Sequence, residues 1–456
     1  MSHPIETLLL LGASGDLASR LLLPALGKLL DAEPDRRDLL VLGAGAEAWD
    51  QEAWRERVRA SFAAAQVSQE TTDAVLATTR YEQADVTQSA DLERLFAAGA
   101  GAPALYFALP PAVTLAACRA MTGMELPPGT VLVLEKPFGT DAASADSLNA
   151  LLTRLVPESQ VHRVDHFLGR STVFNLLGVR FANRIFAPVW SRDHVERVDI
   201  VFDEDLTLED RARYYDHAGA LVDMIQSHLL QVMAVVAMEP VATLDEVDFR
   251  GAKSDVLRAT RVWGGDPVRA ARRARYTAGA IGERQVPDYV AEPGVDPARD
   301  TETLAQVTVE VANQRWAGVP FRLRSGKALG RRRKEVLVTF RPLPHLPTGF
   351  HGQPVPDQLR LLMGPDALSL EMNVNGPGDP LDLEQVALRT DLNPGWLPAY
   401  GEVLSGVLDG DPLLSVRGDN AVQCWRIVDP VLNAWREGRT PLEEYAAGSE
   451  GPAGWA

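Results

Sequence analysis

The hydrophobic and polar positions in the first third of the chain alternate between short apolar runs and longer amphipathic stretches. The apolar runs, which read as strands or strand ends, lie at residues 7–11, 39–45, 84–87, 104–111, 131–139 and 161–169. Continuous apolar runs are typical of strands that are buried on both faces of a parallel sheet. Strands and helices in alternation predict a doubly wound sheet with a ligand crevice at the carboxyl ends of its strands.

The pattern changes after residue 169. A helix is predicted at residues 171–183, a strand at 195–204 and a long apolar helix at 218–239. Alternating apolar and polar segments then follow without helices between them, at residues 307–313, 334–340, 358–363 and 368–374. Such strands favour an antiparallel sheet. In residues 368–374 every second side chain is apolar, as expected of a strand with one buried face.

These patterns predict two domains, as expected for a chain of 456 residues. We expect residues 1–169 to form an α/β, doubly wound Rossmann domain that binds a dinucleotide. Residues 170–456 should form an α+β domain with a large antiparallel sheet, which binds substrate and makes oligomer contacts. Two late helices, near residues 399–409 and 419–437, complete this domain.

Composition and charge restrict the partners of the protein. A chain with 46% hydrophobic and 23% charged residues is that of a globular protein. The formal net charge of −17 argues against nucleic acid or an anionic membrane as a partner, although a small anionic ligand remains compatible with it.

The cysteines and the apolar runs give expectations about location. Cys118 and Cys424 are the only cysteines, so neither a disulfide framework nor a cysteine metal site is expected. No apolar run approaches the roughly 20 residues that span a bilayer. The N-terminus lacks the basic segment of an export signal. We therefore expect a cytoplasmic protein.

The apolar helix at residues 218–239 carries Asp223 and His228 well inside it. Buried ionisable groups are costly unless a partner satisfies them. His228 is either a core histidine bound to a backbone carbonyl or a proton acceptor with a carboxylate partner. On an α-helix, at about 100° per residue, Asp223 and His228 lie about 140° apart, so we expect them to serve different atoms.

A glycine turn follows the first predicted strand. The segment GASGDLA at residues 12–18 joins this strand to a helix. Backbone amides in such a turn and the N-terminus of the helix can bind a pyrophosphate. The spacing G-x-x-G differs from G-x-G-x-x-G, so by itself the turn is equally compatible with a tight strand-to-helix connection.

Eight blocks together carry a more specific signal. They are GASGDLA (12–18), ALPP (108–111), EKPFG (135–139), RVDHFLG (163–169), LVDMIQSH (221–228), TETLA (301–305), RWAGVPFRLRSGKAL (315–329) and YAAGS (445–449). Their order along the chain resembles that of glucose-6-phosphate dehydrogenases. The resemblance covers nearly the whole chain. It implies an oxidoreductase that acts on a CH–OH donor and oxidises the C1 hydroxyl of D-glucose 6-phosphate to 6-phospho-D-glucono-1,5-lactone. This reaction is the first step of the oxidative pentose phosphate pathway of glucose metabolism.

The resemblance also assigns site residues. His228 matches the family's catalytic base, and Asp165 matches the carboxylate that orients it. The substrate-binding positions are Lys136, His166, Arg170, Glu204, Asp223, Lys327 and Arg332, of which His166 and Arg170 should hold the phosphate. Apart from Arg332, the basic run at residues 331–334 is expected to be a solvated loop. The cofactor-binding positions are Gly12, Ala13, Ser14, Gly15, Asp16, Leu17, Glu47, Tyr106, Ala108, Pro110 and Lys136.

Three departures from the family pattern affect specificity. Ala46 replaces the arginine that clamps the 2′-phosphate of NADP, and Glu47 beside it suits the ribose 2′-hydroxyl of NAD. The expected cofactor is therefore NADP or NAD. NAD is favoured unless another cation, such as Arg20, binds the 2′-phosphate of NADP. Phe167 replaces a tyrosine and Arg170 a lysine at the phosphate site, and arginine is not a neutral substitute for lysine.

Two alternative functions remain open. The chain could be a paralogous dehydrogenase for another sugar phosphate or sugar, or a catalytically silent, nucleotide-binding regulatory paralogue. The resemblance implies a homodimer or homotetramer with a small sugar phosphate as its partner. No cluster of histidine, cysteine and carboxylate residues in the sequence predicts a metal site. The cis or trans state of the Lys136–Pro137 bond is not predicted.

Overall fold

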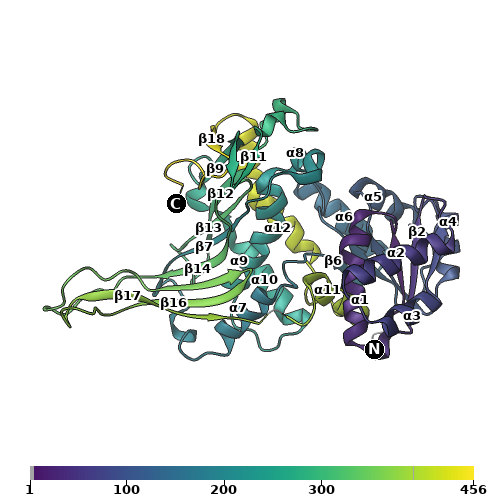
Figure 1. The fold of residues 1–456 in the computed structure, drawn as a ribbon, viewed down its shortest axis with the longest axis horizontal. Coiled ribbons are helices and arrows are strands. Elements are labelled where there is room, and N and C mark those ends of the chain that lie inside the picture. The colour runs from purple at the N-terminus through teal and green to yellow at the C-terminus, as the bar shows by residue number, and fades with distance from the viewer. Residues whose placement is uncertain (1–4, 394, 456) are drawn as a thin grey trace. The chain divides into compact units, whose positions relative to one another are not determined.

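The computed structural model describes residues 5–393 and 395–455 and divides the chain into two compact units (Figure 1). Unit 1 comprises Met1–Arg170, Val241–Ser254 and Gly395–Trp425. Unit 2 comprises Ser171–Pro240, Asp255–Pro394 and Arg426–Ala456. The predicted boundary after residue 169 lies one residue from the first break. The two later segments of unit 1 were not predicted, because contacts between distant segments leave no local sequence pattern.

A parallel sheet of six strands forms the centre of unit 1, with the strand order β3-β2-β1-β4-β5-β6. The strands are β1 (Ile5–Leu11), β2 (Leu40–Gly45), β3 (Arg80–Gln83), β4 (Ala102–Phe107), β5 (Val131–Leu134) and β6 (Val161–Arg163). This order and the parallel pairing confirm the doubly wound α/β domain. The strand predicted around residues 84–87 lies immediately earlier, in β3, and 84–87 form the connection that follows it.

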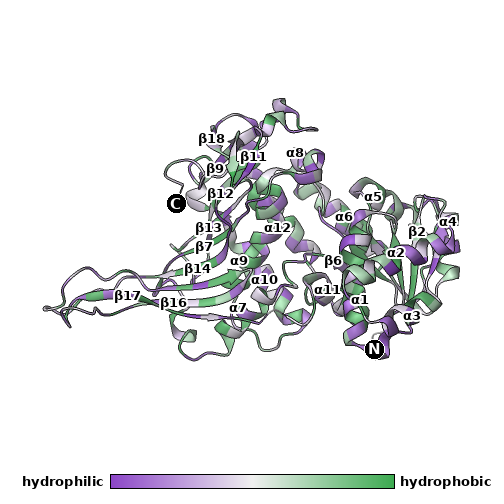
Figure 2. Ribbon diagram, viewed as in Figure 1, coloured by the Kyte–Doolittle hydropathy of each residue, from purple (hydrophilic) through white to green (hydrophobic). Residues whose placement is uncertain are grey.

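Helices cover both faces of this sheet, because successive residues of a buried strand point to opposite sides. Leu8 and Leu10 of β1 pack in one hydrophobic cluster, and Leu9 and Leu11 pack in another. The first cluster contains α1 (Leu23–Ala32), α2 (Gln51–Ala64), α3 (Gln69–Thr78) and α11 (Ala399–Asp409), and the second contains α4 (Ser89–Ala98), α5 (Pro111–Ala120) and α6 (Ala142–Leu155). Figure 2 shows the hydrophobic residues along the strands between these helices.

The second sheet has ten strands and belongs to unit 2, with the order β17-β16-β15-β14-β7-β13-β12-β9-β18 and with β8 paired to β12. The strands are β7 (Val195–Asp203), β8 (Thr260–Val262), β9 (Ala271–Thr277), β12 (Leu304–Val311), β13 (Pro320–Gly326), β14 (Arg333–Phe340), β15 (Gln358–Met363), β16 (Asp366–Asn375), β17 (Leu383–Asp391) and β18 (Leu442–Ala446). The large sheet was predicted, but it is mixed: β13 pairs with β7 and β18 with β9 in parallel. A short hairpin, β10 (Gly279–Ile281) and β11 (Arg284–Val286), lies outside it.

The apolar face of β16 is less covered than its alternation predicts. Leu368 and Leu370 are half-buried and Val374 is 36% exposed, whereas Ser369, on the other face, is only 7% exposed. Leu388 of the neighbouring β17 pairs with Leu370 and is 60% exposed. The apolar side chains of this strand are therefore not covered by the core of the same chain. The prediction that they face the core was wrong.

The long apolar helix of unit 2 consists of consecutive segments. They are α8 (Ala212–Ala220), the π-helical η6 (Leu221–Leu229) and α9 (Leu230–Ala237), and they lie close to the predicted helix at residues 218–239. Over Ala212–Ala237 the chain is long and apolar enough to cross a membrane, and 89% of its most apolar window is buried inside the protein. The expectation that no run approaches this length was wrong. Its burial is that of a core helix.

Three further helices complete the two units. Helix α7 (Ser171–Phe181) contacts α9 and β15 within unit 2. Helices α10 (Glu246–Ala259) and α12 (Gly418–Arg436) each have residues in both units, because the divisions fall within them. The late helices predicted near residues 399–409 and 419–437 correspond to α11 and α12.

Candidate active site

The turn after β1, where the sequence predicts a pyrophosphate-binding loop, is held by short backbone hydrogen bonds. The amides of Gly12 and Ala13 both donate to the carbonyl of Ala44, and the amide of Gly15 donates to the carbonyl of Gly12 at 3.0 Å. Gly12 has a φ of 86°, and a Cβ there would lie 2.3 Å from the carbonyl oxygen of Ala108. Only glycine therefore allows this loop to approach the strand end of β4 so closely. The loop fits a dinucleotide.

The end of β2 presents a carboxylate beside this loop. The Ser14 hydroxyl donates to Oε2 of Glu47 at 2.7 Å, and the Tyr81 hydroxyl donates to the backbone carbonyl of Glu47 at 2.9 Å. Burial and the nearby Glu47 carboxylate raise the pKa of Tyr81 to about 12, so its hydroxyl stays a donor at neutral pH. Glu47 and Ala46 are both exposed. The predicted ribose-binding carboxylate is thus fixed at the glycine loop.

Directly after β5 lies a half-buried acid, Glu135, that the sequence analysis did not select. Tyr106 is fully buried, and its hydroxyl donates to Oε1 of Glu135 at 2.5 Å. Burial raises the pKa of Glu135 to about 7. The hydrogen bonds from Tyr106 and Tyr400 and the charge of Lys136 act to lower this pKa. The side chain of Tyr106 therefore holds Glu135 and offers no exposed surface to a cofactor. The Lys136–Pro137 bond is cis.

Asp165 follows β6 directly and is 1% exposed. Its Oδ1 accepts from the backbone amide of Phe167 at 2.9 Å, which fixes the orientation of the carboxylate. The half-buried His166 ring stacks on Tyr400 at 5.3 Å. The guanidinium of Arg170 lies over the ring of Phe167, 4.4 Å from its centroid, and Phe167 itself is buried. The aromatic ring at this position thus serves as a platform for Arg170.

The sequence analysis also did not identify a buried lysine that interacts with Asp165. Lys253 lies on α10 and is fully buried in unit 1. Burial lowers the pKa of Lys253 to about 8, while the Asp165 carboxylate stabilises its charged form. A lysine within the helical pattern of residues 246–259 gave no local sign of its partner. Its burial became apparent only with the tertiary structure.

The segment that carries Asp223 and His228 is π-helical rather than α-helical. The amide of Leu230 donates to the carbonyl of Ile225, five residues before it. Residues five apart in a π-helix therefore stack on one face, as residues four apart do in an α-helix. Asp223 and His228 are five apart, so the expected separation of about 140° was wrong. They are 5% and 1% exposed, and the Tyr214 hydroxyl donates to Oδ1 of Asp223 at 3.2 Å.

Glu204, at the end of β7, joins two lysines in unit 2. Nζ of Lys327 lies 3.0 Å from Oε2 of Glu204, and Nζ of Lys334 lies 3.0 Å from its Oε1. Burial opposes the ionisation of Glu204, but the two lysines outweigh it and lower its pKa. The expectation that Lys334 is a solvated loop residue was wrong, because it belongs to β14 and is one of this pair. Arg332 is exposed and pairs with Asp205 at 2.6 Å.

The predicted site residues divide between the units. The glycine loop, Glu47, Tyr106, Ala108, Pro110, Lys136, Asp165, His166 and Arg170 lie in unit 1, and Glu204, Asp223, His228, Lys327 and Arg332 lie in unit 2. Within unit 1 the structure brings Ser14 to Glu47, and within unit 2 it brings Lys327 to Glu204. The pairing of Asp165 with His228 stays a prediction.

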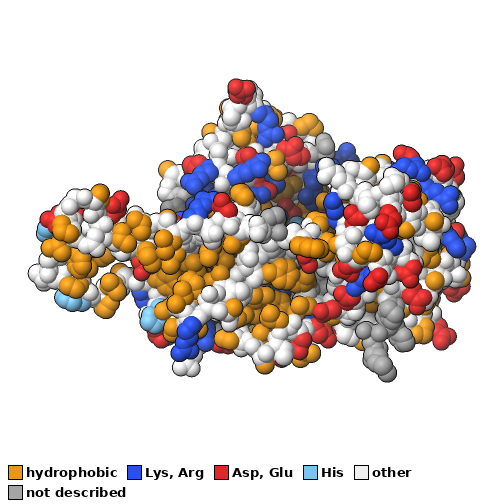
Figure 3. Space-filling model, turned by 60° about the horizontal axis from the view of Figure 1, so that its bottom comes forward, with side chains coloured by type: hydrophobic (Ala, Val, Ile, Leu, Met, Phe, Trp, Pro, Cys, Tyr) orange, Lys and Arg blue, Asp and Glu red, His pale blue; other side chains and the backbone are white. Residues whose placement is uncertain are grey.

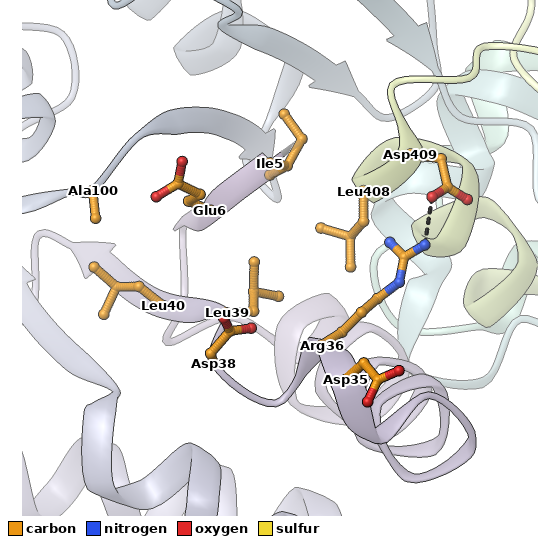
Figure 4. A pocket seen from close by; sticks show the side chains of 10 residues that line it. All are labelled: Ile5, Glu6, Asp35, Arg36, Asp38, Leu39, Leu40, Ala100, Leu408 and Asp409. Carbon is orange, nitrogen blue, oxygen red and sulfur yellow. Dashed lines mark hydrogen bonds and ion pairs between the residues drawn. The ribbon is translucent and has the colours of Figure 1, made fainter. Parts of the chain in front are cut away.

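One cavity of unit 1 contains no predicted site residue. It has a volume of about 640 Å³ and is lined near the amino ends of β1 and β2, where Arg36 pairs with Asp409 of α11 (Figure 4). Ligands of doubly wound sheets bind at the carboxyl ends of the strands. Glu6, Asp35 and Asp38 also line this cavity, and their negative charge does not suit an anionic dinucleotide. We therefore do not assign it to the cofactor.

Comparisons with known proteins give two family matches that follow one another along the chain. The family model for the NAD-binding domain of glucose-6-phosphate dehydrogenase matches residues 9–175, and that for the C-terminal domain matches residues 177–456. Glucose-6-phosphate 1-dehydrogenase of Gluconobacter oxydans (strain 621H) is 37% identical over 97% of this chain and 93% of its own length. The Treponema pallidum (strain Nichols) enzyme of the same name is 36% identical over 98% and 92%.

Solved structures show the same relationship. The crystal structure of glucose-6-phosphate 1-dehydrogenase from Mycobacterium avium has a TM-score of 0.85 and 32% identity, and the match covers 99% of this chain and 96% of that one. A glucose-6-phosphate dehydrogenase in complex with glucose 6-phosphate has a TM-score of 0.87 and 26% identity, with coverage of 100% and 97%. These matches extend over both units.

Proposed function

Because the chain belongs to the glucose-6-phosphate dehydrogenase family, we propose that it oxidises the C1 hydroxyl of D-glucose 6-phosphate to 6-phospho-D-glucono-1,5-lactone. The nicotinamide of a bound dinucleotide accepts the hydride in this reaction. The observation that carries the proposal is the match of both domains to this family over nearly the whole chain. The glycine loop, into which a Cβ at Gly12 could not fit, supports the dinucleotide.

In the proposed mechanism, His228 takes the proton of the C1 hydroxyl on a ring nitrogen. Asp165 orients the imidazole and stabilises its protonated form, as a carboxylate does for the histidine of a catalytic triad. The hydrogen bond from the Phe167 amide holds Asp165 in place. The burial of Asp165 and His228 supports these roles, since it strengthens electrostatic interactions between them.

The substrate is held by charged and polar side chains in this proposal. Arg170 and His166 bind the phosphate, which suits a guanidinium that stacks on Phe167 and an imidazole that stacks on Tyr400. The sugar hydroxyls bind the remaining predicted residues, which are Lys136, Glu204, Asp223, Lys327 and Arg332. Lys334 joins this set, because it shares the carboxylate of Glu204 with Lys327.

For the cofactor we propose a preference for NAD over NADP. The Ser14 and Tyr81 hydrogen bonds hold Glu47 at the glycine loop, where a carboxylate binds a ribose 2′-hydroxyl and repels a 2′-phosphate. The proposed alternative clamp, Arg20, is exposed on the π-helical turn Ala18–Leu22. If Arg20 bound the 2′-phosphate, NADP would be the better cofactor.

One kinetic panel tests both proposals. We expect the absorbance of reduced nicotinamide to rise when glucose 6-phosphate is supplied, with a higher kcat/KM for NAD than for NADP. Glu47→Gln should shift this ratio towards NADP by about tenfold, which corresponds to about 1.4 kcal/mol, because it removes the repulsion between the Glu47 carboxylate and a 2′-phosphate. A strong wild-type preference for NADP would contradict the assignment of Glu47.

The same panel separates the alternative functions. Turnover of another sugar or sugar phosphate, but not of glucose 6-phosphate, would favour a paralogous dehydrogenase. No turnover with any aldose or its phosphate, with either cofactor, would favour a silent nucleotide-binding paralogue. The family match and the buried pair of Asp223 and His228 support the active enzyme.

We also propose that the protein is a homodimer or homotetramer. The incompletely covered apolar face of β16 and β17, with Val374 and Leu388, supports contact with a second copy. Figure 3 shows hydrophobic side chains gathered on unit 2. We expect light scattering to give a molar mass of two or four chains, and Leu388→Glu to lower it. A mass of one chain would contradict the proposal.

We expect the enzyme to act in the cytoplasm. Cys118 and Cys424 are buried cysteines that are not joined in a disulfide, which suits a reducing compartment. Cell fractionation that recovers the activity with secreted proteins would contradict this expectation.

A further inference from the structure

The structure points to a positioning residue that lies in the block TETLA (301–305) but to which the resemblance assigns no role. We infer that Glu302 holds the start of the helix that carries Asp223 and His228, and that this contact sets the position of Asp223 for substrate binding. The inference rests on the proposed function, because it takes the roles of Asp223 and His228 from it. Its evidence is the contact between the segment at residues 301–303 and the bend at Gly219.

The chain begins a new helix at this bend. Gly219 has φ 65° and ψ 173°, so the helical path of α8 is interrupted there. The first amides of a helix have no partner within the helix and need another acceptor. The amide of Leu221 donates to Oε1 of Glu302 at 2.9 Å, and the amide of Ala220 donates to the Glu302 carbonyl oxygen at 3.2 Å. Glu302 therefore accepts hydrogen bonds from two successive backbone amides at the start of this helix.

Gly219 allows the carboxyl group of Glu302 to come this close. A Cβ at Gly219 would lie 2.3 Å from Oε1 of Glu302 and 2.7 Å from its Cδ. The positive φ and this contact both favour glycine. Glu302 is only 7% exposed. The bend and the glutamate are thus fitted to one another.

Glu302 is itself firmly held by the sheet. The next residue, Thr303, donates its amide to the carbonyl of Ala274 and accepts the amide of Lys327, both at 2.9 Å. Lys327 belongs to the proposed substrate site and pairs with Glu204. The segment with Glu302 therefore connects the helix start to the lysine of the substrate site.

A shift of the helix start would first affect Asp223, which lies two residues beyond Leu221. The Tyr214 hydroxyl donates to Oδ1 of Asp223 at 3.2 Å, and Tyr214 lies in α8, before the bend at Gly219. The geometry of the bend thus decides whether this hydrogen bond forms. His228 lies one π-helical turn further on and is held in the core by Leu229 and Leu230, which are fully buried.

The chemistry of Glu302 provides a conservative replacement. Burial raises the pKa of the Glu302 carboxyl to about 7, and the hydrogen bond from Leu221 opposes this rise. Near neutral pH the side chain is therefore partly neutral. Glutamine has nearly the same shape and keeps an oxygen that can accept from Leu221. Alanine keeps neither.

The test compares steady-state kinetics of variants of the full-length enzyme. Glu302→Ala should raise the KM for glucose 6-phosphate about tenfold or more, as misplaced binding groups do, with a smaller change in kcat and no change in the KM of the nucleotide. Glu302→Gln should restore most of the wild-type KM. Glu310→Ala is the matched control, because Glu310 lies in β12, which begins two residues after Glu302, and pairs with Arg261. If Glu302→Ala does not fold, Glu302→Asp, which shortens the side chain, carries the same expectation.

Asp223→Asn separates the inference from the proposed function. A raised KM in Asp223→Asn together with an unchanged KM in Glu302→Ala would overturn the inference and leave the proposed function intact. An unchanged KM in Asp223→Asn would instead refute the proposed sugar contact, and the inference with it.

A double-mutant cycle tests the contact itself. Gly219→Ala should cost less in kcat/KM in the Glu302→Ala background than in the wild type, because the overlap with the carboxylate is gone. Additive losses would overturn the inference, since they would show that the two residues do not interact.

Discussion

Replacement of His228 by asparagine should lower kcat by at least about a hundredfold, the scale of general acid–base catalysis. Asparagine fills a similar volume but cannot take a proton, so the C1 hydroxyl would lose its acceptor. The KM for glucose 6-phosphate should change much less, because other residues bind the sugar in the proposed site. Steady-state kinetics with saturating cofactor measure both constants.

The chain offers a matched control for this variant. His217 is exposed on α8, where its Nδ1 lies 2.8 Å from the carbonyl oxygen of Arg213. His217→Asn should leave kcat unchanged. Near wild-type kcat in His228→Asn would place the base elsewhere.

The partnership of Asp165 with His228 is tested in the same series. If Asp165 acts by orienting the imidazole, Asp165→Asn should lower kcat strongly in the wild type and little in the His228→Asn background. Equal losses in the two backgrounds would mean that Asp165 acts independently of His228.

Replacement of Arg170 by alanine should raise the KM for glucose 6-phosphate by about ten- to a hundredfold, since a hydrogen bond to a charged group is worth about 1.5–3 kcal/mol. The guanidinium lies over Phe167 and would provide a positive charge for the phosphate in the proposed site. The kcat should change less, because Arg170 binds the far end of the sugar from C1. Kinetics with glucose 6-phosphate and with unphosphorylated glucose measure the effect.

The comparison of the two sugars makes this test specific. Arg170→Ala should leave kcat/KM for glucose unchanged, because glucose carries no phosphate. Arg170→Lys should retain part of the affinity through its charge, but without the stacked, planar fork of arginine. Arg154→Ala, at an exposed arginine of α6, is the control. An unchanged KM for glucose 6-phosphate in Arg170→Ala would move the phosphate to another site.

The departures from the family pattern are not independent of one another. A tyrosine at position 167 would add a hydroxyl, whereas Phe167 is buried and supports Arg170 with its ring face. The phenylalanine and the arginine therefore form one cation–π arrangement.

Features encoded in local patterns could be predicted from the sequence. The strands of the parallel sheet are buried on both sides, so their sequences are continuous apolar runs. The glycine turn after β1 is recognisable because only glycine fits beside Ala108. The helix at residues 218–239 was visible because it is buried almost all round, and the blocks around Asp165 and His228 identified the family.

Only the tertiary structure decided how these side chains are presented. Hydrophobic spacing does not distinguish an α-helix from the π-helical turn that brings Asp223 and His228 to one face, because the hydrogen bonds that distinguish them involve the backbone. Lys334 joined the proposed substrate site through its pairing with Glu204, 130 residues away. The same holds for Glu302, whose partner Leu221 is 81 residues distant. Local sequence determined which elements form, and long-range contacts determined what each charged group meets.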